Sequence, residues 1–228
     1  MALTVPAKQG LAWLQLDDEV NVQGVSGRLL DGHAQQLTIN NISMNQFDWS
    51  WRPLALLLGH LSLDWIANDP DMTGKGNAVF SLVGQNEISN VKASLSLVKI
   101  QALLPIGTTL TGQADIVLQQ LLFEQTITAI NASLEGHDIL VVTAFGKINL
   151  PILYLHATGT LTEGFELTLE DDQKNTTVNL IAKYLNGQIA LSGEIKASSN
   201  IAKQLSNILP VIAKKQGGKW LVEWHYKG

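Results

Sequence analysis

The side chains best suited to chemistry in this sequence are its 5 histidines and two runs of carboxylates. The acidic runs Asp17-Asp18-Glu19 and Asp171-Asp172 contain the carboxylate pairs that a glycosidase would need. Adjacent carboxylates in turn-like contexts are usually only solvated, however, and that is our prediction for both runs. We also expect structural or solvated histidines, because no two have the close spacing typical of a metal site; they are His33, His60, His137, His156 and His225.

Other catalytic patterns are absent from the sequence. It has no Gly-x-Ser-x-Gly nucleophile elbow, and Gly74-Lys75-Gly76 is typical of a hairpin tip rather than of a phosphate-binding loop. The absence of cysteine excludes disulfides, thiolate metal sites and cysteine catalysis. We therefore predict no enzyme, no cofactor and no metal site; an enzyme acting on envelope glycans is the least favoured alternative.

The composition favours a chain that buries much of its length or lies beside an apolar surface. Hydrophobic residues make up 46% and charged residues 15%, whereas about 25% charged residues is typical of soluble domains. The net charge of -5 and the scattered basic residues argue against nucleic-acid binding. The start, MALTVPAKQG, does not resemble a signal peptide, and no stretch is long and apolar enough to span a bilayer. We expect either a cytosolic chain or one whose targeting segment has been removed.

The elements that would position any site are mostly strands, because hydrophobic residues alternate with polar ones at period two. The alternating runs are Phe47-Trp49-Trp51, Leu61-Leu63-Trp65, Ala78-Phe80-Leu82, Val91-Ala93-Leu95-Leu97, Val178-Leu180-Ala182-Tyr184 and Ile189-Leu191-Gly193-Ile195. Turn-forming residues lie between such runs, among them Asn40-Asn41, Asn68-Asp69-Pro70-Asp71, Glu135-Gly136-His137-Asp138 and Asn186-Gly187. Asn-Gly is the strongest of these, because both residues tolerate the positive φ of a type I′ turn.

Three segments break the alternation and predict short helices. Residues 52–59 place Pro53 at a helix start and Gly59 at its end. Residues 98–104 precede Pro105, and residues 199–215 form an amphipathic stretch that Pro210 should kink or end. With residues 139–196 as a continuous meander, the sequence predicts a mainly β fold. We expect a large, strongly curved antiparallel sheet, open or half-barrel-like, with about three short amphipathic helices.

A dense motif near the start of the chain points to a family. Gly24-Val25-Ser26-Gly27 is followed by a turn at Gly32 and then by the run from Trp51 through Pro53 and Leu57 to Gly59. In this order the motif resembles the opening of the type II secretion system protein N family. We expect Gly24, Gly27 and Gly32 to permit tight turns, and the proline-to-glycine unit to fold a helix across an aromatic sheet face.

The resemblance implies a role without catalysis. Members of the family resemble inner-membrane proteins with one N-terminal spanning helix and a periplasmic domain, and they are grouped with AsmA-like envelope proteins. By this analogy residues 1–228 would be a single periplasmic β-rich domain, with the membrane helix absent from this sequence. The implied function is an accessory one in assembling or stabilising the export machine, with its other components as partners. The implied location is the periplasmic face of the bacterial inner membrane.

The closing strand carries the candidate interaction surface, formed by Trp220, Trp224 and Tyr226. If this strand is an uncovered edge, it can accept a strand from a neighbour, so homo-oligomerisation or docking there is a hypothesis. A lipid or other hydrophobic ligand held in the curved sheet is the alternative. In that case residues 53–58 and 199–212 would shelter an acyl chain.

Overall fold

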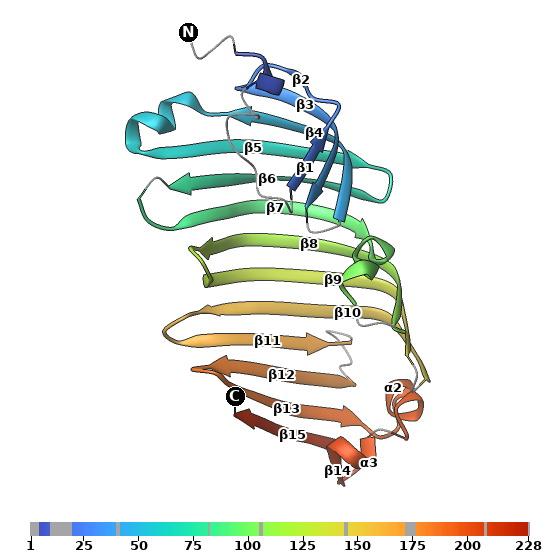
Figure 1. Ribbon diagram of the computed structural model, residues 1–228. Helices are drawn as coiled ribbons and strands as arrows, with labels where there is room; N and C mark the ends of the chain where they lie inside the picture. Colours follow the sequence, from blue (N-terminus) through green and yellow to red (C-terminus); the bar gives the residue numbers. More distant parts are fainter. Residues whose placement is uncertain are drawn as a thin grey trace.

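The computed structural model of this chain describes residues 5–9, 20–39, 42–81, 83–104, 107–143, 146–171, 177–207 and 209–227. The strands of these residues form one open, curved sheet of 15 strands (Figure 1). The predicted turn at Asn40-Asn41, the acids Asp17-Asp18-Glu19 and Pro105 lie outside the described residues.

All neighbouring strands are antiparallel, and from β3 to β13 their order in the sheet is their order in the sequence. The mainly β, antiparallel, open sheet predicted from the alternation is therefore confirmed. β1 and β2 both pair with β3, and the order ends β13-β15-β14. The strands are β1 (Val20–Gln23), β2 (Ser26–Gly27), β3 (Asp31–Ile39), β4 (Ile42–Trp51), β5 (His60–Asp69), β6 (Met72–Ser81), β7 (Asn86–Ser96), β8 (Thr109–Phe123), β9 (Ile127–Thr143), β10 (Gly146–Thr160), β11 (Gly164–Glu170), β12 (Val178–Leu185), β13 (Gln188–Lys196), β14 (Ala213–Gln216) and β15 (Lys219–Lys227).

Two residues in the left-handed region interrupt the pairing of long strands. Asn90 in β7 has φ 53° and Asp138 in β9 has φ 50°, and the register shifts by one residue next to each. Such bulges increase the local twist and bend a sheet. The predicted turn at Glu135-Gly136-His137-Asp138 is thus wrong: the same residue types that favour a turn here form a bulge inside one 17-residue strand.

Four short helices have both ends within the described residues: the 3₁₀ helices η2 (Pro53–Leu58) and η3 (Leu97–Leu103), and the α-helices α2 (Asn200–Gln204) and α3 (Leu209–Ile212). The first two confirm the predictions for residues 52–59 and 98–104. The third prediction holds only in part, because Pro210 lies at the start of a second helix and residues 213–216 pair as β14. The Ser199 hydroxyl caps α2 by accepting from the Ala202 N–H at 3.0 Å.

One face of the sheet carries the core, and we call it the apolar face. Its buried side chains include Leu95 on β7, Ile139 on β9, Leu153 on β10 and Ile195 on β13. At one end of the strands η3, α2 and α3 lie against this face (Figure 1). In particular, the helix residues Ile201, Ala202 and Leu209 pack with Val178, Ile195 and Val222 of the sheet.

A buried ion pair fixes η3 to β4 and β5. Asp69 at the end of β5 is only 2% exposed, and Lys99 on η3 donates to its Oδ2 at 3.1 Å and to the Ser43 carbonyl at 3.0 Å. The Asn45 side-chain amide and the backbone N–H groups of Asn45 and Asp71 also donate to the carboxylate. The cost of burying the charge is therefore offset by four donors from three segments.

This site predicts acid sensitivity. Burial raises the pKa of Asp69, but the hydrogen bonds from Asp71 and Asn45 and the charge of Lys99 outweigh burial and leave the pKa below its ordinary value. The unfolded chain then takes up the proton first, so the stabilisation is present above about pH 4 and is lost as the pH falls further. We expect urea midpoints to fall between about pH 5 and pH 3, with a shallower fall in Asp69→Ala. Equal pH slopes in the two proteins would contradict this.

Candidate functional site

The candidate interaction surface lies on a strand that is only half covered. β15 pairs along one side with β13 over its whole length, from Lys219 to Lys227. On the other side β14 pairs only with residues 219–222. Among the described residues, nothing pairs with that side of residues 223–227, which leaves backbone donors and acceptors free to accept a further strand.

Two aromatic rings lie on this free half of β15. Trp224 and Tyr226 are 48% and 51% exposed, and their rings stack with centroids 6.0 Å apart. Trp220, which the sequence placed in the same surface, is instead half-buried and packs against the cluster formed by α2, α3 and the sheet. The Lys215 ammonium lies over its ring, 5.8 Å from the centroid. The exposed surface is therefore the pair Trp224 and Tyr226.

The pair continues a row of side chains that crosses six strands on the apolar face. Register places Tyr226 beside Ile189, Ile189 beside Tyr184, and Tyr184 beside Phe165. Gly159 separates Phe165 from Ile130 on β9. The Phe165 and Tyr184 rings stack with centroids 6.4 Å apart. Aromatic anchors in such rows dominate binding energy where a partner buries them.

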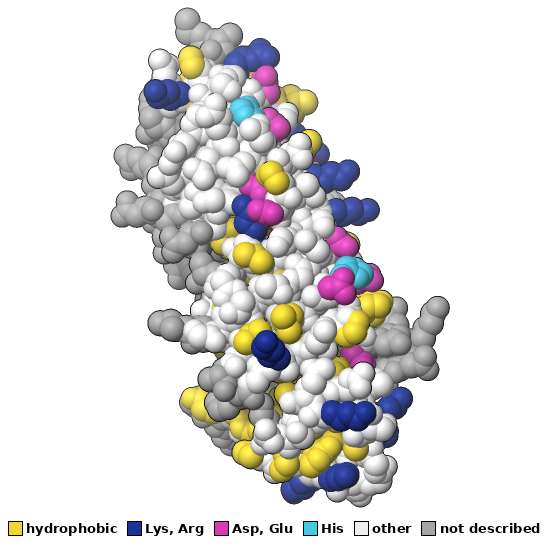
Figure 2. All heavy atoms as spheres, turned by 90° about the vertical axis from the view of Figure 1, so that its right-hand side faces the viewer, with side chains coloured by type: hydrophobic (Ala, Val, Ile, Leu, Met, Phe, Trp, Pro, Cys, Tyr) yellow, Lys and Arg dark blue, Asp and Glu magenta, His cyan; other side chains and the backbone are white. Residues whose placement is uncertain are grey.

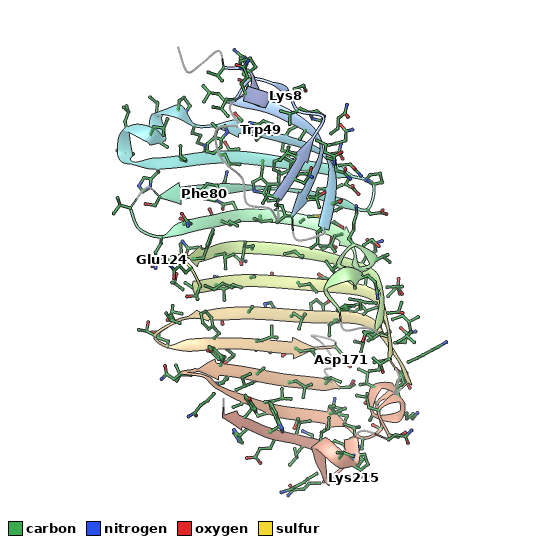
Figure 3. The ribbon with its side chains drawn as sticks, viewed as in Figure 1. Lys8, Trp49, Phe80, Glu124, Asp171 and Lys215 are labelled. Atoms are coloured by element: carbon green, nitrogen blue, oxygen red, sulfur yellow. The ribbon has the colours of Figure 1, made fainter. Side chains whose placement is uncertain are left out.

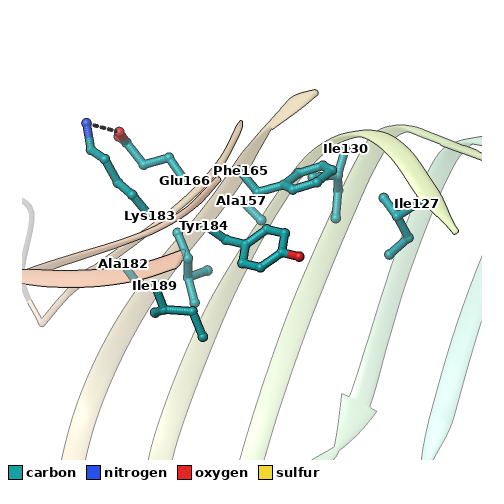
Figure 4. A pocket seen from close by; sticks show the side chains of 10 residues that line it. Ile127, Ile130, Ala157, Phe165, Glu166, Ala182, Lys183, Tyr184 and Ile189 are labelled. Carbon is teal, nitrogen blue, oxygen red and sulfur yellow. Dashed lines mark ion pairs between the residues drawn. The ribbon is translucent and has the colours of Figure 1, made fainter. Parts of the chain in front are cut away.

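A hollow of about 350 Å³ lies within this row. Its floor is formed where the small residues Ala157 and Ala182 face the same side as Phe165 and Tyr184. Figure 4 shows Phe165 and Tyr184 on one side of the ribbon, and Glu166 and Lys183 on the other side, joined by an ion pair of 2.9 Å. The side chains that face the hollow are thus apolar, and its volume lies within the range of ligand sites. Glu166 and Lys183 also line it, but their charged ends point to the other side of the ribbon.

The two ends of the apolar face differ in their cover. At one end α2 and α3 bury Val178 and Ile195, whereas at the other end of the same strands Tyr184 and Ile189 remain 44% and 38% exposed. Figure 2 shows the side that carries the helices, with hydrophobic side chains gathered mainly in its lower half and charges of both signs along it. An apolar patch without cover is the usual mark of an interaction surface.

The family-motif residues lie at the N-terminal corner, away from the hollow. Gly24 and Gly27 have φ of 63° and 81°, as expected for tight turns. The tight turn expected at Gly32 is wrong. Gly32 lies inside β3, where a Cβ would come within 2.3 Å of the Trp49 ring. The Trp49 indole N–H donates to the Leu29 carbonyl at 2.9 Å. Gly32 thus makes room for a buried tryptophan.

The second half of the motif forms a projection, and the expectation that its helix folds across the sheet face is wrong. Pro53 begins η2, and Gly59 ends it with φ 76°. No residue of η2 is buried, and Leu57 points into solvent. Trp51, just before the helix, packs with Ala7, Ala34 and Trp49.

The described residues suited to chemistry make surface pairings, such as that of His137 Nε2, which lies 3.6 Å from both Asp115 Oδ2 and Glu135 Oε1. His33 and Asp48 pair on the surface at 2.8 Å, and the Asp171 carboxylate accepts from the Thr177 and Val178 N–H groups. Within the described ranges, no three of His, Cys, Asp and Glu converge on a point where a metal ion could bind. None of the described helices is both long and apolar enough to cross a bilayer.

Comparison with known proteins then decides the family. The sequence model of "Type II secretion system (T2SS), protein N" matches residues 18–222, which is most of the chain. The chain belongs to this family. It is similar to the type II secretion system protein N of Vibrio cholerae serotype O1 (strain ATCC 39315 / El Tor Inaba N16961), with 29% identity over 126 residues. That alignment covers 52% of this chain and 49% of the relative, so it spans about half of the relative's length. No solved structure is significantly similar to the chain.

Among the residues of this protein N family member, the ones that sequence reasoning missed are Phe165, Tyr184 and Ile189 around the hollow. A signal for them existed, since the Asn186-Gly187 turn fixes Tyr184 opposite Ile189. Phe165 required the register of the next hairpin, whose turn residues 161–163 have no comparable signature.

Proposed function

We propose that this chain is a component of a type II secretion system and assists the assembly or stability of that machine without catalysing a reaction. The observation that carries the proposal is the family match over residues 18–222. The proposal places the domain on the periplasmic side of the inner membrane, held by a helix that precedes this sequence.

The uncovered end of the apolar face is the docking surface in this proposal. Trp224 and Tyr226 offer rigid rings, the hollow beside Tyr184 accepts an apolar side chain, and the free half of β15 offers backbone partners. An extended segment of another secretion-system component would satisfy all three at once, by adding a strand beside residues 223–227. A second copy of this chain, paired along the same edge, is the other occupant that the test distinguishes.

We expect the double substitution Trp224→Ala and Tyr226→Ala to weaken this contact about 100-fold, because exposed aromatic anchors each contribute about 1–2 kcal/mol to an interface. The stability of the folded state should change little, because both rings are about half exposed to solvent. Thermal unfolding checks the second point. The first is measured by comparing how much of each secretion-system protein co-purifies with the double variant and with the wild type. A photocrosslinker placed at Trp224 in bacterial envelopes locates the contact, with a crosslinker at Lys183 on the opposite face of β12 as the control.

The expected result is an adduct with another secretion-system protein from position 224 and none from 183. An adduct between two copies of this chain would replace the hetero-docking proposal by homo-oligomerisation. Equal labelling from both positions would contradict the role of the apolar face.

A second candidate function rests on the hollow itself. Its lining by Ile130, Phe165, Tyr184 and Ile189 suits one acyl chain of a lipid, and the predicted kinship with AsmA-like proteins is consistent with that role. The shelter expected from η2 does not form, since its leucines project into solvent. Lipid bound in stoichiometric amount to purified protein would favour this function over docking.

A further inference from the structure

Among the described helices and strands, η2 is the most exposed apolar element, and the proposed function does not use it. Leu54, Leu57 and Leu58 are 76%, 83% and 77% exposed, and Leu56 is 49% exposed. We call these four side chains the leucine tip. Figure 1 shows η2 projecting from the end of the sheet between β4 and β5, and Phe80 labelled in Figure 3 lies at the same end.

The directions of the leucine side chains indicate which kind of surroundings can bury them. In a 3₁₀ helix successive residues lie about 120° apart, so Leu56, Leu57 and Leu58 point in three different directions. A protein groove buries one face of a helix and would leave the other leucines in water. A fluid apolar medium surrounds a projection on every side. We therefore propose that the leucine tip inserts into the surface of a lipid bilayer.

The base of the tip is built to hold this position. Arg52 forms two hydrogen bonds with Asp64, of 2.9 Å and 2.7 Å, so its charge is paired at the level of the sheet. Its backbone N–H donates to the Ser62 carbonyl at 2.8 Å. No residue from Pro53 to Leu58 is charged. The tip thus carries only apolar side chains above a fixed polar base, the arrangement that interfacial insertion needs.

Neighbouring loops limit the contact to one corner. Ser81 pairs with His60, the second residue after η2, and Val83, two residues beyond Ser81, is 93% exposed. The next hairpin tips at this end carry Glu124 and Glu163, which would be costly in hydrocarbon. Insertion therefore involves the leucine tip and Val83 alone.

The same corner also holds the N-terminal segment. The Val5 carbonyl accepts from the Leu29 N–H at 2.9 Å, and the Leu30 carbonyl accepts from Trp51, two residues before η2. A membrane tether before residue 1, as in the proposed function, would leave the chain beside the tip. Insertion of the leucine tip does not require that tether, and residues 1–228 alone should bind lipid.

The test uses the absence of cysteine, which makes one introduced thiol a unique label site. An environment-sensitive dye is attached to Leu57→Cys and, as a matched control, to Val211→Cys on α3, which is also 83% exposed. Vesicles of phosphatidylcholine, with and without phosphatidylglycerol, are then added. We expect a blue shift and a rise in emission at position 57 only.

A second variant measures binding itself. Leu57→Glu with Leu58→Glu should lower partitioning of the chain onto vesicles at least about tenfold, because two apolar side chains are lost from the buried surface. Val211→Glu should leave it unchanged. With a net charge of -5 the chain has no attraction to anionic lipid, so added salt should not weaken binding. Equal dye responses at both positions, no vesicle binding, or a response at position 57 only to another secretion-system protein would overturn the proposal.

Discussion

Replacing Asp69 by alanine should lower the free energy of unfolding by about 3–5 kcal/mol, the range expected when one partner of a buried ion pair is removed. Asp69 is almost fully buried, and Lys99 is mostly so. Without the carboxylate, the ammonium would keep only the Ser43 carbonyl, and the donors of Asn45 and Asp71 would lose their acceptor. Urea denaturation followed by tryptophan fluorescence measures the loss.

Two further variants test whether the loss of stability in Asp69→Ala is specific to the buried ion pair. Lys99→Met removes the cation but leaves Asp69 with the donors of Asn45 and Asp71, so the expected loss is smaller. Asp48→Ala removes an exposed carboxylate from the neighbouring strand β4, where the partner is His33, and should cost less than about 1 kcal/mol. If Asp69→Ala were no more destabilising than Asp48→Ala, the buried pair would not hold η3 to the sheet.

Gly193→Ala should destabilise the fold about as much as Asp69→Ala. We expect backbone strain and steric overlap together to lower the free energy of unfolding by about 4 kcal/mol or more. Gly193 lies in the middle of β13 with φ 147°, and a Cβ there would come within 2.1 Å of the Asn179 carbonyl oxygen on β12. The oxygen belongs to backbone that is paired in the sheet, so it cannot move aside cheaply. The change should therefore separate β12 from β13.

Gly187→Ala is the matched control, because Gly187 lies in the turn between β12 and β13. Its φ is 76°, and a Cβ added there would have no other atom within 4 Å. Only the left-handed backbone conformation then disfavours alanine, and we expect the free energy of unfolding to fall by about 1–2 kcal/mol. Thermal or urea unfolding of both variants gives the comparison. Similar losses at the two glycines would show that the close approach of the Asn179 carbonyl does not constrain β13.

Sequence alone predicted the strands because alternation is a local property. Tyr184 and Ile189 each belong to a run with hydrophobic residues two positions apart, and the two turn residues between their strands require positive φ, which both have. The start and end of η2 were equally predictable, since Pro53 and Gly59 act through their own backbone geometry. These signals need no knowledge of any distant part of the chain.

Features that depend on distant neighbours were not predictable. Gly74-Lys75-Gly76 resembles a turn but lies inside β6, where a Cβ on Gly76 would come within 3.0 Å of the Trp65 ring. The leucines of η2 suggest burial, yet no described element lies over them. Asp69 resembled a solvated turn residue, because its partner Lys99 is 30 positions away.

The candidate site also combines features that were predictable from local sequence with features that were not. Exposed rings at Trp224 and Tyr226 were predictable from the closing strand. That Trp220 belongs to the core was not, because α2 and α3 provide its cover. The hollow around Phe165 required the register of five strands at once.

We propose that this protein N family member works as a docking component of a secretion machine. The most direct test of this proposal is gentle capture of the full-length protein from bacterial envelopes, followed by mass spectrometry of the co-purifying proteins and lipids. We predict other type II secretion components in the wild-type sample and their loss when Trp224 and Tyr226 are both alanine. Stoichiometric lipid without those components would contradict the claim and favour a lipid-binding groove.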